Sequence, residues 1–469
     1  MTRRYFLMSA ATALAASAQP KPRRNVLFIA SDDLNHCFSA YGHAVVRTPN
    51  LDSIAARGVR FDRAYCQYPL CSPSRTSVMT GLAPDATGVY DLRKHFRESV
   101  PDVVTLGQAF QKNDYFVGRV GKIYHYGNPG QIGTNGLDDE PTWNQRVNPA
   151  GVDKTKEEPL LTNYTPDRGL GSSVCFYASP AKDEEHTDGM VASEIIRLME
   201  EHRGKPWFLG AGFYKPHCPW ISPAKYFDMV PLDRVKLVPF EEWEMTIAPR
   251  WAYFTMPANW GMTEKQRLEA MRAYYAAILF LDAQVGRVLN ALRRGGEEQN
   301  TTIVFWSDHG YGLGEHGQWM KQTVFEYAAH SPLMMCGAGI SARGKACGRT
   351  VEFLDMYPTL ADLCGLRDVP KGLHGRSLRP LLDNPNAPWE RPAVTQVHRT
   401  LQKREVRGYS LRTERYRYTM WDEGREGEEL YDYSSDPREL KNLAKETDSA
   451  ALKQTLRSRL DGIIASRRA

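Results

Sequence analysis

The chain has 469 residues, of which 42% are hydrophobic and 25% are charged. These values are typical of a globular protein with a large core, and they exclude a disordered or collagen-like chain. The formal net charge of +5 is small and scattered along the chain, so it gives no argument for binding nucleic acid.

The first twenty residues are predicted to be an export signal and not part of the fold. Arg3 and Arg4 precede an apolar, alanine-rich stretch, and the triplet Ala16-Ser17-Ala18 suits a cleavage site. The paired arginines resemble a twin-arginine signal. No later apolar run reaches the roughly 18 residues that a membrane span needs. We therefore expect a periplasmic or secreted protein without a membrane span.

From about residue 25 to residue 364, short apolar runs alternate with helical patterns. This arrangement predicts an α/β fold, with strands and crossover helices around a large, mostly parallel sheet. Five runs lack strict alternation, which is typical of strands covered on both faces. They are residues 25–30, 115–120, 207–213, 302–306 and 333–336.

The longest predicted helix begins after Thr263 and ends at Arg294. Thr263 and Gln266 have the spacing of a capping box, and two glycines follow Arg294. A helix of this length is expected to bend along its course. One apolar stripe is expected to face the sheet, and it consists of Leu268, Met271, Tyr275, Ile278 and Ala283.

Residues 127–187 are rich in Gly, Pro, Asp and Asn and show no lasting periodicity. A long irregular insertion is often functional, so it is interpreted as a wall or lid near a site, with a surface insertion without a role as the alternative. Alternating stretches at residues 409–413 and 415–419 and a helical pattern over residues 449–465 predict a C-terminal α+β unit with an antiparallel sheet. The expected organisation is a signal at 1–20, an α/β domain at 21–385 and a C-terminal subdomain at 386–469.

Polar residues follow four of the predicted strands. In an open parallel sheet, functional groups gather beyond the carboxyl ends of the strands, so we expect these residues to converge on one edge. They are Ser31-Asp32-Asp33, then Lys122 and His125, then Lys215, His217 and Cys218, and finally Ser307-Asp308-His309.

A divalent metal is implied by this convergence. Three carboxylates, those of Asp32, Asp33 and Asp308, would repel one another at close range unless a cation lay among them. Oxygen ligands favour Ca²⁺ or Mg²⁺, although His309 leaves a transition metal as an alternative.

One of the eight cysteines stands apart from the others, which are scattered without a C-x-x-C pair. Cys71 precedes Pro73, a residue that suits the first position of a helix, so Cys71 is expected at a helix N-terminus. Arg75 falls one turn later on the same face. Such a cysteine is expected to have a lowered pKa, and the general interpretation is a thiolate nucleophile.

This segment resembles a known family. Cys71-x-Pro73-x-Arg75, continuing to Met79-Thr80-Gly81, resembles the signature of the type I sulfatases, in which the cysteine is oxidised to Cα-formylglycine. The resemblance extends over nearly the whole chain after the predicted signal. Several segments look like the iduronate-2-sulfatase branch of the family, namely residues 121–125, 215–217, 307–310 and 313–317.

The resemblance implies an alkaline-phosphatase-like fold and a set of site residues. The calcium ligands would be Asp32, Asp33, Asp308, His309 and the modified Cys71, with Mg²⁺ as the other candidate ion. Lys122 and Lys321 would contact the sulfate, His125 would stabilise the formylglycine diolate, Arg75 would hold it from within the helix, and His217 would approach the ester oxygen as a general acid. A formylglycine-generating maturation enzyme would be a partner.

The expected function is therefore that of a sulfatase acting on a sulfated sugar, from a polysaccharide or oligosaccharide that contains uronic acid. Two alternatives remain. One is a phosphate or phosphonate monoester hydrolase on the same scaffold, and the other is a carbohydrate-binding relative in which Cys71 is never oxidised.

Overall fold

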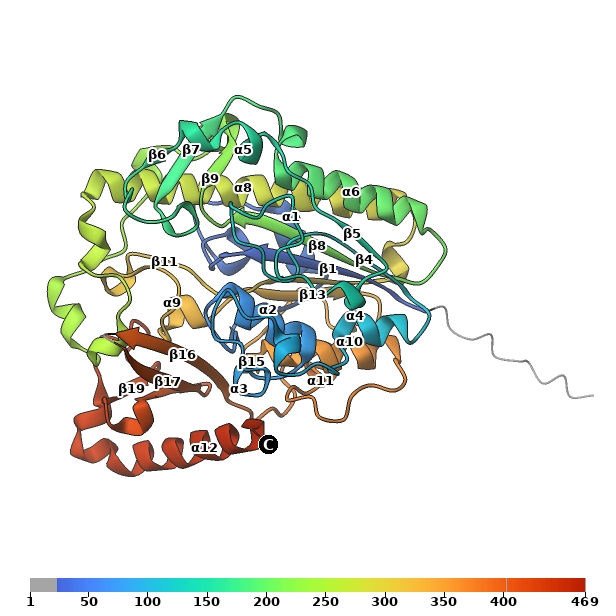
Figure 1. The fold of residues 1–469 in the computed structure, drawn as a ribbon. Coiled ribbons are helices and arrows are strands. Elements are labelled where there is room, and N and C mark those ends of the chain that lie inside the picture. Colours follow the sequence, from blue (N-terminus) through green and yellow to red (C-terminus); the bar gives the residue numbers. More distant parts are fainter. Residues whose placement is uncertain (1–22, 402, 469) are drawn as a thin grey trace, which may run out of the picture.

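The computed structural model describes residues 23–401 and 403–468 (Figure 1). The predicted export signal lies outside the described residues and stays a prediction. Within those two ranges, no helix is long and apolar enough to cross a membrane.

An eight-stranded sheet forms the centre of the molecule, in the order β14-β2-β13-β10-β1-β8-β4-β5. Only β13 runs antiparallel to its neighbours, β10 and β2, and the other adjacent strands are parallel. The five predicted strands are all present, so the prediction of a mostly parallel sheet is confirmed. The strands are β1 (Asn25–Asp32), β2 (Gly58–Phe61), β4 (Phe116–Gly121), β5 (Gln145–Val147), β8 (Trp207–Pro216), β10 (Thr301–Ser307), β13 (Leu333–Gly337) and β14 (Lys345–Cys347).

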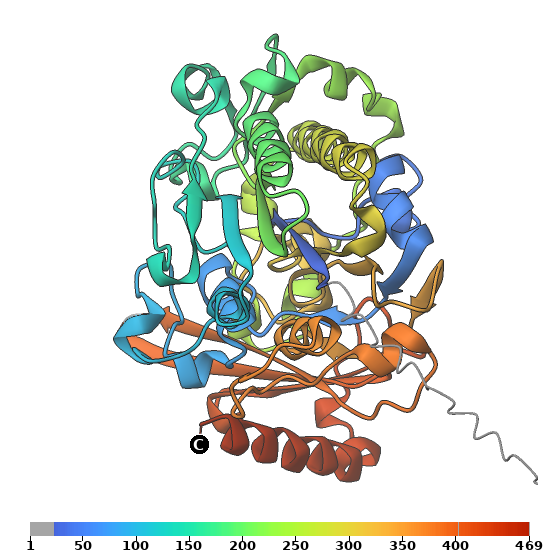
Figure 2. The same cartoon turned by 90° about the vertical axis from the view of Figure 1, so that its right-hand side faces the viewer.

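Helices cover both faces of this sheet (Figures 1 and 2). Successive residues of β1 point to opposite faces, so Leu27 joins one apolar cluster while Phe28 joins another. The first cluster includes residues of α1 (Pro49–Arg57), α6 (Thr187–Glu201) and α8 (Glu264–Arg294). The second includes residues of α2 (Cys71–Thr80), α4 (Leu106–Gln111) and α10 (Met356–Cys364). Burial on both faces explains why the strands lack polar alternation.

The long helix α8 has the predicted capping box, in which Thr263 and Gln266 exchange hydrogen bonds between side chain and backbone. Its 31 residues form one continuous helix. The expectation that one apolar stripe is the buried face of α8 is partly wrong. Leu268 and Ala283, within the stripe, are only half-buried, whereas Tyr274, outside it, is fully buried. The reason is that α8 packs against α1, α6 and α7 (Ala224–Asp228) as well as against β8.

The insertion at 127–187 contains short regular elements and is not structureless as its composition indicated. They are β5, α5 (Val152–Thr155), β6 (Thr162–Asn163) and β7 (Cys175–Ser179), separated by turns of 3-10 helix. Strands β6 and β7 form a small sheet with β9 (Trp220–Pro223). Elements of two to five residues are too short to leave a periodic pattern in the sequence.

The C-terminal part is an antiparallel four-stranded sheet in the order β16-β17-β18-β19, followed by α12 (Ala450–Arg468). Its strands are β16 (Ala393–Leu401), β17 (Arg404–Arg412), β18 (Tyr416–Trp421) and β19 (Glu428–Asp432). The predicted antiparallel sheet and closing helix are confirmed. The predicted boundary at 385/386 stays a prediction, and it falls between α11 (Arg379–Asp383) and β16.

This C-terminal sheet has two different faces. One packs against α12 through residues such as Leu411 and Leu460. The other packs against the segment that precedes α2 and against residues 324–325, with Val397 and Trp421 meeting Tyr68 and Phe325. The second face therefore supports the chain on both sides of the predicted site. The remaining short elements are α3 (Pro84–Thr87), α9 (Glu326–Ala329), β3 (Ala64–Tyr65), β11 (Gly312–Leu313), β12 (Trp319–Met320) and β15 (Val351–Glu352).

Candidate active site

The predicted polar residues converge at the carboxyl edge of the central strands. Asp32 is the last residue of β1, and Asp308 follows β10, the parallel neighbour of β1. Lys122 directly follows β4, and His217 directly follows β8. Tertiary structure therefore brings together chain segments that lie far apart in the sequence.

Two overlapping groups of side chains have the spacing of a metal site. Ligand atoms of Asp32, Asp33, Cys71 and His217 lie within 4.8 Å of one another, and so do those of Cys71, Asp308 and His309.

His309 is oriented to offer a lone pair to this centre. Its Nδ1 lies 2.9 Å from the carbonyl oxygen of Gly310, so Nδ1 donates a proton there and Nε2 is left as the acceptor. Nε2 lies 3.4 Å from Oδ1 of Asp33 and 3.6 Å from Oδ1 of Asp308. Burial lowers the pKa of His309 to about 4, so the ring is neutral and competent to bind a metal.

Three buried cations lie among the three carboxylates. Nζ of Lys122 is 2.5 Å from Oδ2 of Asp32, and Nζ of Lys321 is 2.5 Å from Oδ1 of Asp33. Nε of Arg75 donates to Oδ2 of Asp308 at 2.9 Å. We call these six residues the catalytic cluster, namely Asp32, Asp33, Arg75, Lys122, Asp308 and Lys321.

Arg75 makes hydrogen bonds to the backbone in addition to its ion pair with Asp308. Besides Asp308, its guanidinium donates to the carbonyl oxygens of Lys122 at 2.6 Å and Ser31 at 3.0 Å. It therefore joins α2 to the ends of β1 and β4.

The two adjacent aspartates are in different electrostatic states. Burial raises the pKa of Asp32, but the nearby Lys122, His217 and Arg75 outweigh it and hold the pKa well below its usual value. Burial raises the pKa of Asp33 to about 7, because the neighbouring Asp32 and Asp308 add to the effect and Lys321 offsets it only in part. Oδ2 of Asp33 is buried without a hydrogen-bond partner among the described residues.

These features fit a divalent cation. The carboxylates and the neutral imidazole are ligands of the kind that Ca²⁺ and Mg²⁺ accept, and the unpartnered Oδ2 of Asp33 is a donor atom that the protein leaves unused. In this structure Lys122 and Lys321 are paired with the carboxylates of Asp32 and Asp33. They can bind another anion only if a different cation replaces them at those carboxylates. The residues present therefore fit a divalent ion, while its identity is open between the two.

Cys71 is the first residue of α2, directly after the N-cap Leu70, as expected. Pro73 is the third helical residue and not the first, so that detail of the expectation is wrong. The Cys71 Sγ atom lies 3.3 Å from Nζ of Lys321, 3.4 Å from Oδ1 of Asp32 and 3.5 Å from Nε2 of His309.

The expected low pKa of Cys71 is also wrong. Burial, together with the carboxylate of Asp32, raises the pKa of the thiol well above its usual value, and Lys122 and Lys321 do not compensate for it. The helix N-terminus favours a thiolate, but α2 is buried over its whole length, and the desolvation of a charged sulfur outweighs that effect.

The two histidines have different places. Nε2 of His217 lies 3.6 Å from Oδ2 of Asp33, and its Nδ1 faces the carbonyl oxygen of Cys218. His125 is near enough for Lys122 to affect its charge, but no hydrogen bond joins it to Cys71 in the described structure, and its Nδ1 is unpartnered. Burial lowers the pKa of both rings well below the usual value, so neither is protonated near neutral pH as the general-acid expectation for His217 assumed.

The insertion at 127–187 borders this centre. The backbone at Gly171 is so close that a methyl group there would lie 3.9 Å from Cε1 of His217 and would clash with the carbonyl oxygen of Asn128. This position agrees with a wall beside the site.

Tyr274 is a supporting residue that the sequence did not reveal. Its hydroxyl donates to the carbonyl oxygen of Asp33 at 2.7 Å and accepts from the backbone N–H of Asn35 at 2.9 Å, while Asp33 itself has a left-handed backbone (φ 64°). Tyr274 thereby helps to hold Asp33 in an unfavourable conformation. It lies within the apolar pattern of α8, so no local signal marks it.

Comparisons with known proteins agree with this geometry. The family model named Sulfatase matches residues 24–366, and the model of the N-sulphoglucosamine sulphohydrolase C-terminal region matches residues 314–466. A sulfatase of Formosa agariphila is 32% identical over 468 aligned positions, covering 95% of this chain and 89% of the relative. Iduronate 2-sulfatase of Homo sapiens is 30% identical over 523 positions, covering 92% and 93%.

Solved structures share the architecture. A 2-O GAG sulfatase superposes with a TM-score of 0.74 at 25% identity, covering 95% of this chain and 93% of its own. The phosphonate monoester hydrolase of Agrobacterium radiobacter superposes with a TM-score of 0.77 at 24% identity, covering 95% and 96%. The scaffold is therefore similar to proteins named for two kinds of ester.

Proposed function

The chain belongs to the sulfatase family, with its alkaline-phosphatase-like fold, and is a sulfuric ester hydrolase; from this premise we propose that it hydrolyses sulfate esters of sugars through a formylglycine made from Cys71. The substrate class is a polysaccharide or oligosaccharide that contains uronic acid. This proposal is supported by the 30% identity to iduronate 2-sulfatase over most of both chains.

One observation carries the proposal. Sγ of Cys71, the residue that the family signature marks for oxidation, lies within 3.5 Å of a lysine, a carboxylate and an imidazole. Its raised pKa argues against an ordinary thiolate nucleophile, because a buried neutral thiol is a weak one. The signature and the surrounding charges together favour a modified residue.

The roles of the protein groups follow from their positions. Asp32, Asp33, Asp308 and His309 would hold Ca²⁺ or Mg²⁺, which would supply Lewis-acid stabilisation of the sulfate oxygens. Formylglycine would supply two geminal hydroxyls, one for attack on sulfur and one for the later release of sulfate.

The lysines would bind the substrate. With Asp32 and Asp33 holding a metal ion, Lys122 and Lys321 would be available to contact the oxygens of a sulfate beside Cys71. Arg75 has no such freedom, since its guanidinium is bonded to backbone carbonyls as well as to Asp308, so its role would be to orient the start of α2.

His217 is the candidate general acid for the sugar hydroxyl. Its neutral state in the structure means that it must gain a proton when an anionic substrate binds beside it, because an added negative charge raises the pKa of a neighbouring imidazole. His125, at the same edge, would contact the hydroxyls of the modified Cys71.

Export and maturation complete the proposal. Residues 1–20 would direct the protein to the periplasm or the exterior, and a formylglycine-generating enzyme would act on the Cys71 segment before α2 is buried, because that segment is inaccessible in the folded structure.

The decisive experiment combines mass spectrometry with sulfate release. Conversion of Cys71 to formylglycine lowers the mass of its peptide by about 18 Da. Cys71→Ala should abolish sulfate release, whereas Cys364→Ala, at a half-buried cysteine far along the chain, should leave it unchanged. Full activity of the Cys71→Ala protein would refute the proposal, and an unmodified Cys71 in an inactive protein would favour the carbohydrate-binding alternative.

A second candidate function is supported by the phosphonate monoester hydrolase that shares the fold. Parallel assays of a sulfate, a phosphate and a phosphonate ester of 4-nitrophenol separate the two. We expect the sulfate ester to have the highest kcat/KM, and a preference for the phosphonate would establish the alternative.

A further inference from the structure

Two arginines near the catalytic cluster carry positive charge without a carboxylate partner. Among the described residues, neither Arg168 nor Arg399 has an acidic oxygen within the 4.0 Å of an ion pair. Each instead lies over an aromatic ring, Arg168 over Trp260 at 4.2 Å and Arg399 over Phe254 at 5.3 Å. Stacking uses only the face of a guanidinium, so the N–H groups on its edge that donate to no protein oxygen can bind an anion.

Arg399 lies beside the segment that carries Lys321. It extends from β16, and its Nη2 donates to the carbonyl oxygen of Gln322, the residue after Lys321, while its Nε donates to the carbonyl oxygen of Trp251 at 3.3 Å. The backbone N–H of Gln322 donates in turn to Pro69, two residues before Cys71. Through the backbone of Gln322 and Pro69, Arg399 is thus connected to the segments that carry Lys321 and Cys71.

Arg168 lies beside the segment that borders His217. It belongs to the insertion, and its Nε donates to the carbonyl oxygen of Ser172 at 2.8 Å, so its position is fixed relative to Gly171, the residue that borders His217. Its stacking partner Trp260 follows Asn259, whose side chain accepts from the indole of Trp319 at 2.8 Å. Both arginines are therefore held by segments that reach the site.

The charge of each arginine is poorly compensated by the protein. Burial lowers the pKa of Arg399 to about 10 and also lowers the pKa of Arg168. In the buried Arg75 and Arg417, by contrast, neighbouring acidic groups outweigh burial and raise the pKa. A desolvated charge without a partner is costly, and an anion bound beside it recovers part of that cost.

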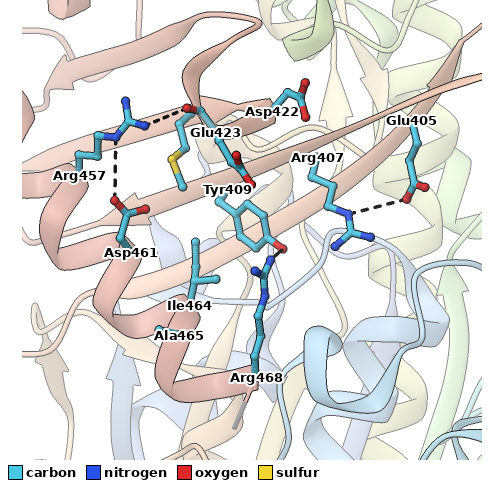
Figure 3. Close-up of a pocket in the computed structure, with 11 residues that line it drawn as sticks. Glu405, Arg407, Tyr409, Asp422, Glu423, Arg457, Asp461, Ile464, Ala465 and Arg468 are labelled. Atoms are coloured by element: carbon cyan, nitrogen blue, oxygen red, sulfur yellow. Dashed lines mark hydrogen bonds and ion pairs between the residues drawn. The ribbon is translucent and has the colours of Figure 1, made fainter.

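The arginines of a pocket in the C-terminal part are different. Figure 3 shows this cavity of about 540 Å³ between β17 and α12. Arg407 faces Glu405 at 3.9 Å, Arg457 faces Asp461 at 3.9 Å, and Arg468 pairs with Asp85 at 3.0 Å. Each of these arginines already has an acidic partner within the protein, so none of them needs an added anion. Arg407 therefore serves as a control.

We propose that Arg168 and Arg399 bind anionic groups of the substrate other than the sulfate that is removed, each group being a carboxylate or a second sulfate. This inference rests on the proposed function, because it extends the same site to the rest of the sugar. Planar, bidentate hydrogen bonding to either anion is the interaction for which arginine is best suited. The enzyme would then select saccharides with several negative charges.

The test uses the mature full-length enzyme and three matched substrates. They are 4-nitrophenyl 2-O-sulfo-α-iduronide, the corresponding 2-O-sulfo-idoside in which a hydroxymethyl group replaces the carboxylate, and the 2,6-di-O-sulfo-idoside, which restores an anion as sulfate. Sulfate release gives kcat/KM for each. The wild-type enzyme should prefer one or both of the doubly anionic substrates over the 2-O-sulfo-idoside by at least about tenfold.

The variants Arg168→Gln and Arg399→Gln should each reduce that preference by at least about tenfold, a change of about 1.4 kcal/mol. Arg168→Lys and Arg399→Lys should retain part of it, since they keep the charge and lose the planar fork. Arg407→Gln should leave the preference unchanged. Which substrate loses most in the glutamine variants identifies the anion as carboxylate or sulfate.

The preference is a ratio of kcat/KM values. A variant that merely misplaces Lys321 would lower kcat/KM for all three substrates and leave the ratio unchanged. That result would overturn the proposal. A wild-type enzyme without preference would overturn it too, even if no variant folds. Failure of the proposed function looks different, because the wild-type enzyme would then release sulfate from none of the three substrates.

Discussion

Two of the charge clusters among the described residues differ in one respect. In the first, the catalytic cluster, the three carboxylates meet three cations, yet Oδ2 of Asp33 remains without a partner. In the second, Glu326 accepts from Tyr65 at 2.7 Å, from Arg412 at 3.2 Å and from Arg417, while Arg417 also pairs with Glu439 at 2.7 Å. We call these residues the Glu326 cluster, and it joins α9 to the C-terminal sheet.

If the proposed function holds, this difference separates a structural cluster from a functional one. The charges of the Glu326 cluster are paired with one another, and its remaining N–H groups donate to nearby protein oxygens, so its role is to attach two parts of the fold. Among the described residues, the catalytic cluster retains an unused acceptor, and its two buried lysines are paired with carboxylates that a metal would bind better. A buried group without a partner is costly, and such groups persist where a ligand supplies the missing partner.

The largest expected effect is on catalysis. Asp33→Asn should lower kcat/KM for a sulfate ester on the order of 10³-fold, because it removes a charged metal ligand and weakens stabilisation of the transition state. Sulfate release and metal content by elemental analysis measure this. If the variant kept a tenth of the wild-type activity with a full metal content, the distinction between the two clusters would not hold.

The next effect is on stability. Glu326→Ala should lower the free energy of unfolding by about 3–5 kcal/mol, because it leaves Arg412 and Arg417 buried without their shared anion. Urea unfolding followed by fluorescence measures it. The control is Glu414→Ala, whose exposed pair with Arg349 should contribute about 0–1 kcal/mol. Equal losses in the two variants would contradict the structural role of Glu326.

Metal removal should separate the clusters directly. At a Ca²⁺ concentration 100 times its Kd, the ion should stabilise the wild-type protein by about 2.7 kcal/mol relative to protein treated with a chelator. Glu326→Ala should retain this increment, and Asp33→Asn should lose most of it. A calcium-independent Tm, tested also with Mg²⁺, would remove the argument for a bound ion.

The smallest effect is on the pH dependence of stability. Burial raises the pKa of Glu326, but Arg412 and Arg417 outweigh it and hold the pKa well below the usual value of 4.5. The unfolded chain therefore takes up the proton first, so the contribution of Glu326 is present above pH 4.5 and is lost as the pH falls toward the folded-state pKa.

Glu326→Gln removes this titration. The difference in unfolding free energy between the wild type and this variant should therefore shrink as the pH falls from 6 to 3, by up to about 1.4 kcal/mol per pH unit. Urea titrations at several pH values measure the difference. A constant difference over that range would show that Glu326 does not titrate with a lowered pKa.

Much of the fold was predictable because its signals are local. The apolar runs that became β1, β4, β8, β10 and β13 and the capping box of α8 each lie within a few neighbouring residues. The direction of β13 was not predictable, since an apolar run has no polarity, and neither were the short strands of the insertion. The buried face of the long helix α8 was only partly predictable. Elements pack against α8 from several sides, so Tyr274 is buried although it lies outside the expected stripe.

The candidate site shows the same division. The sequence by itself indicated the residues that we propose carry the chemistry, because the segment that begins at Cys71 and the polar residues after each strand are short patterns along the chain. Only the tertiary structure decided that Cys71 has a raised pKa and that, among the described residues, Asp33 keeps an unused oxygen and Arg168 and Arg399 lack acidic partners. These properties depend on burial and on distances between remote segments, such as the 288 positions that separate Asp33 from Lys321.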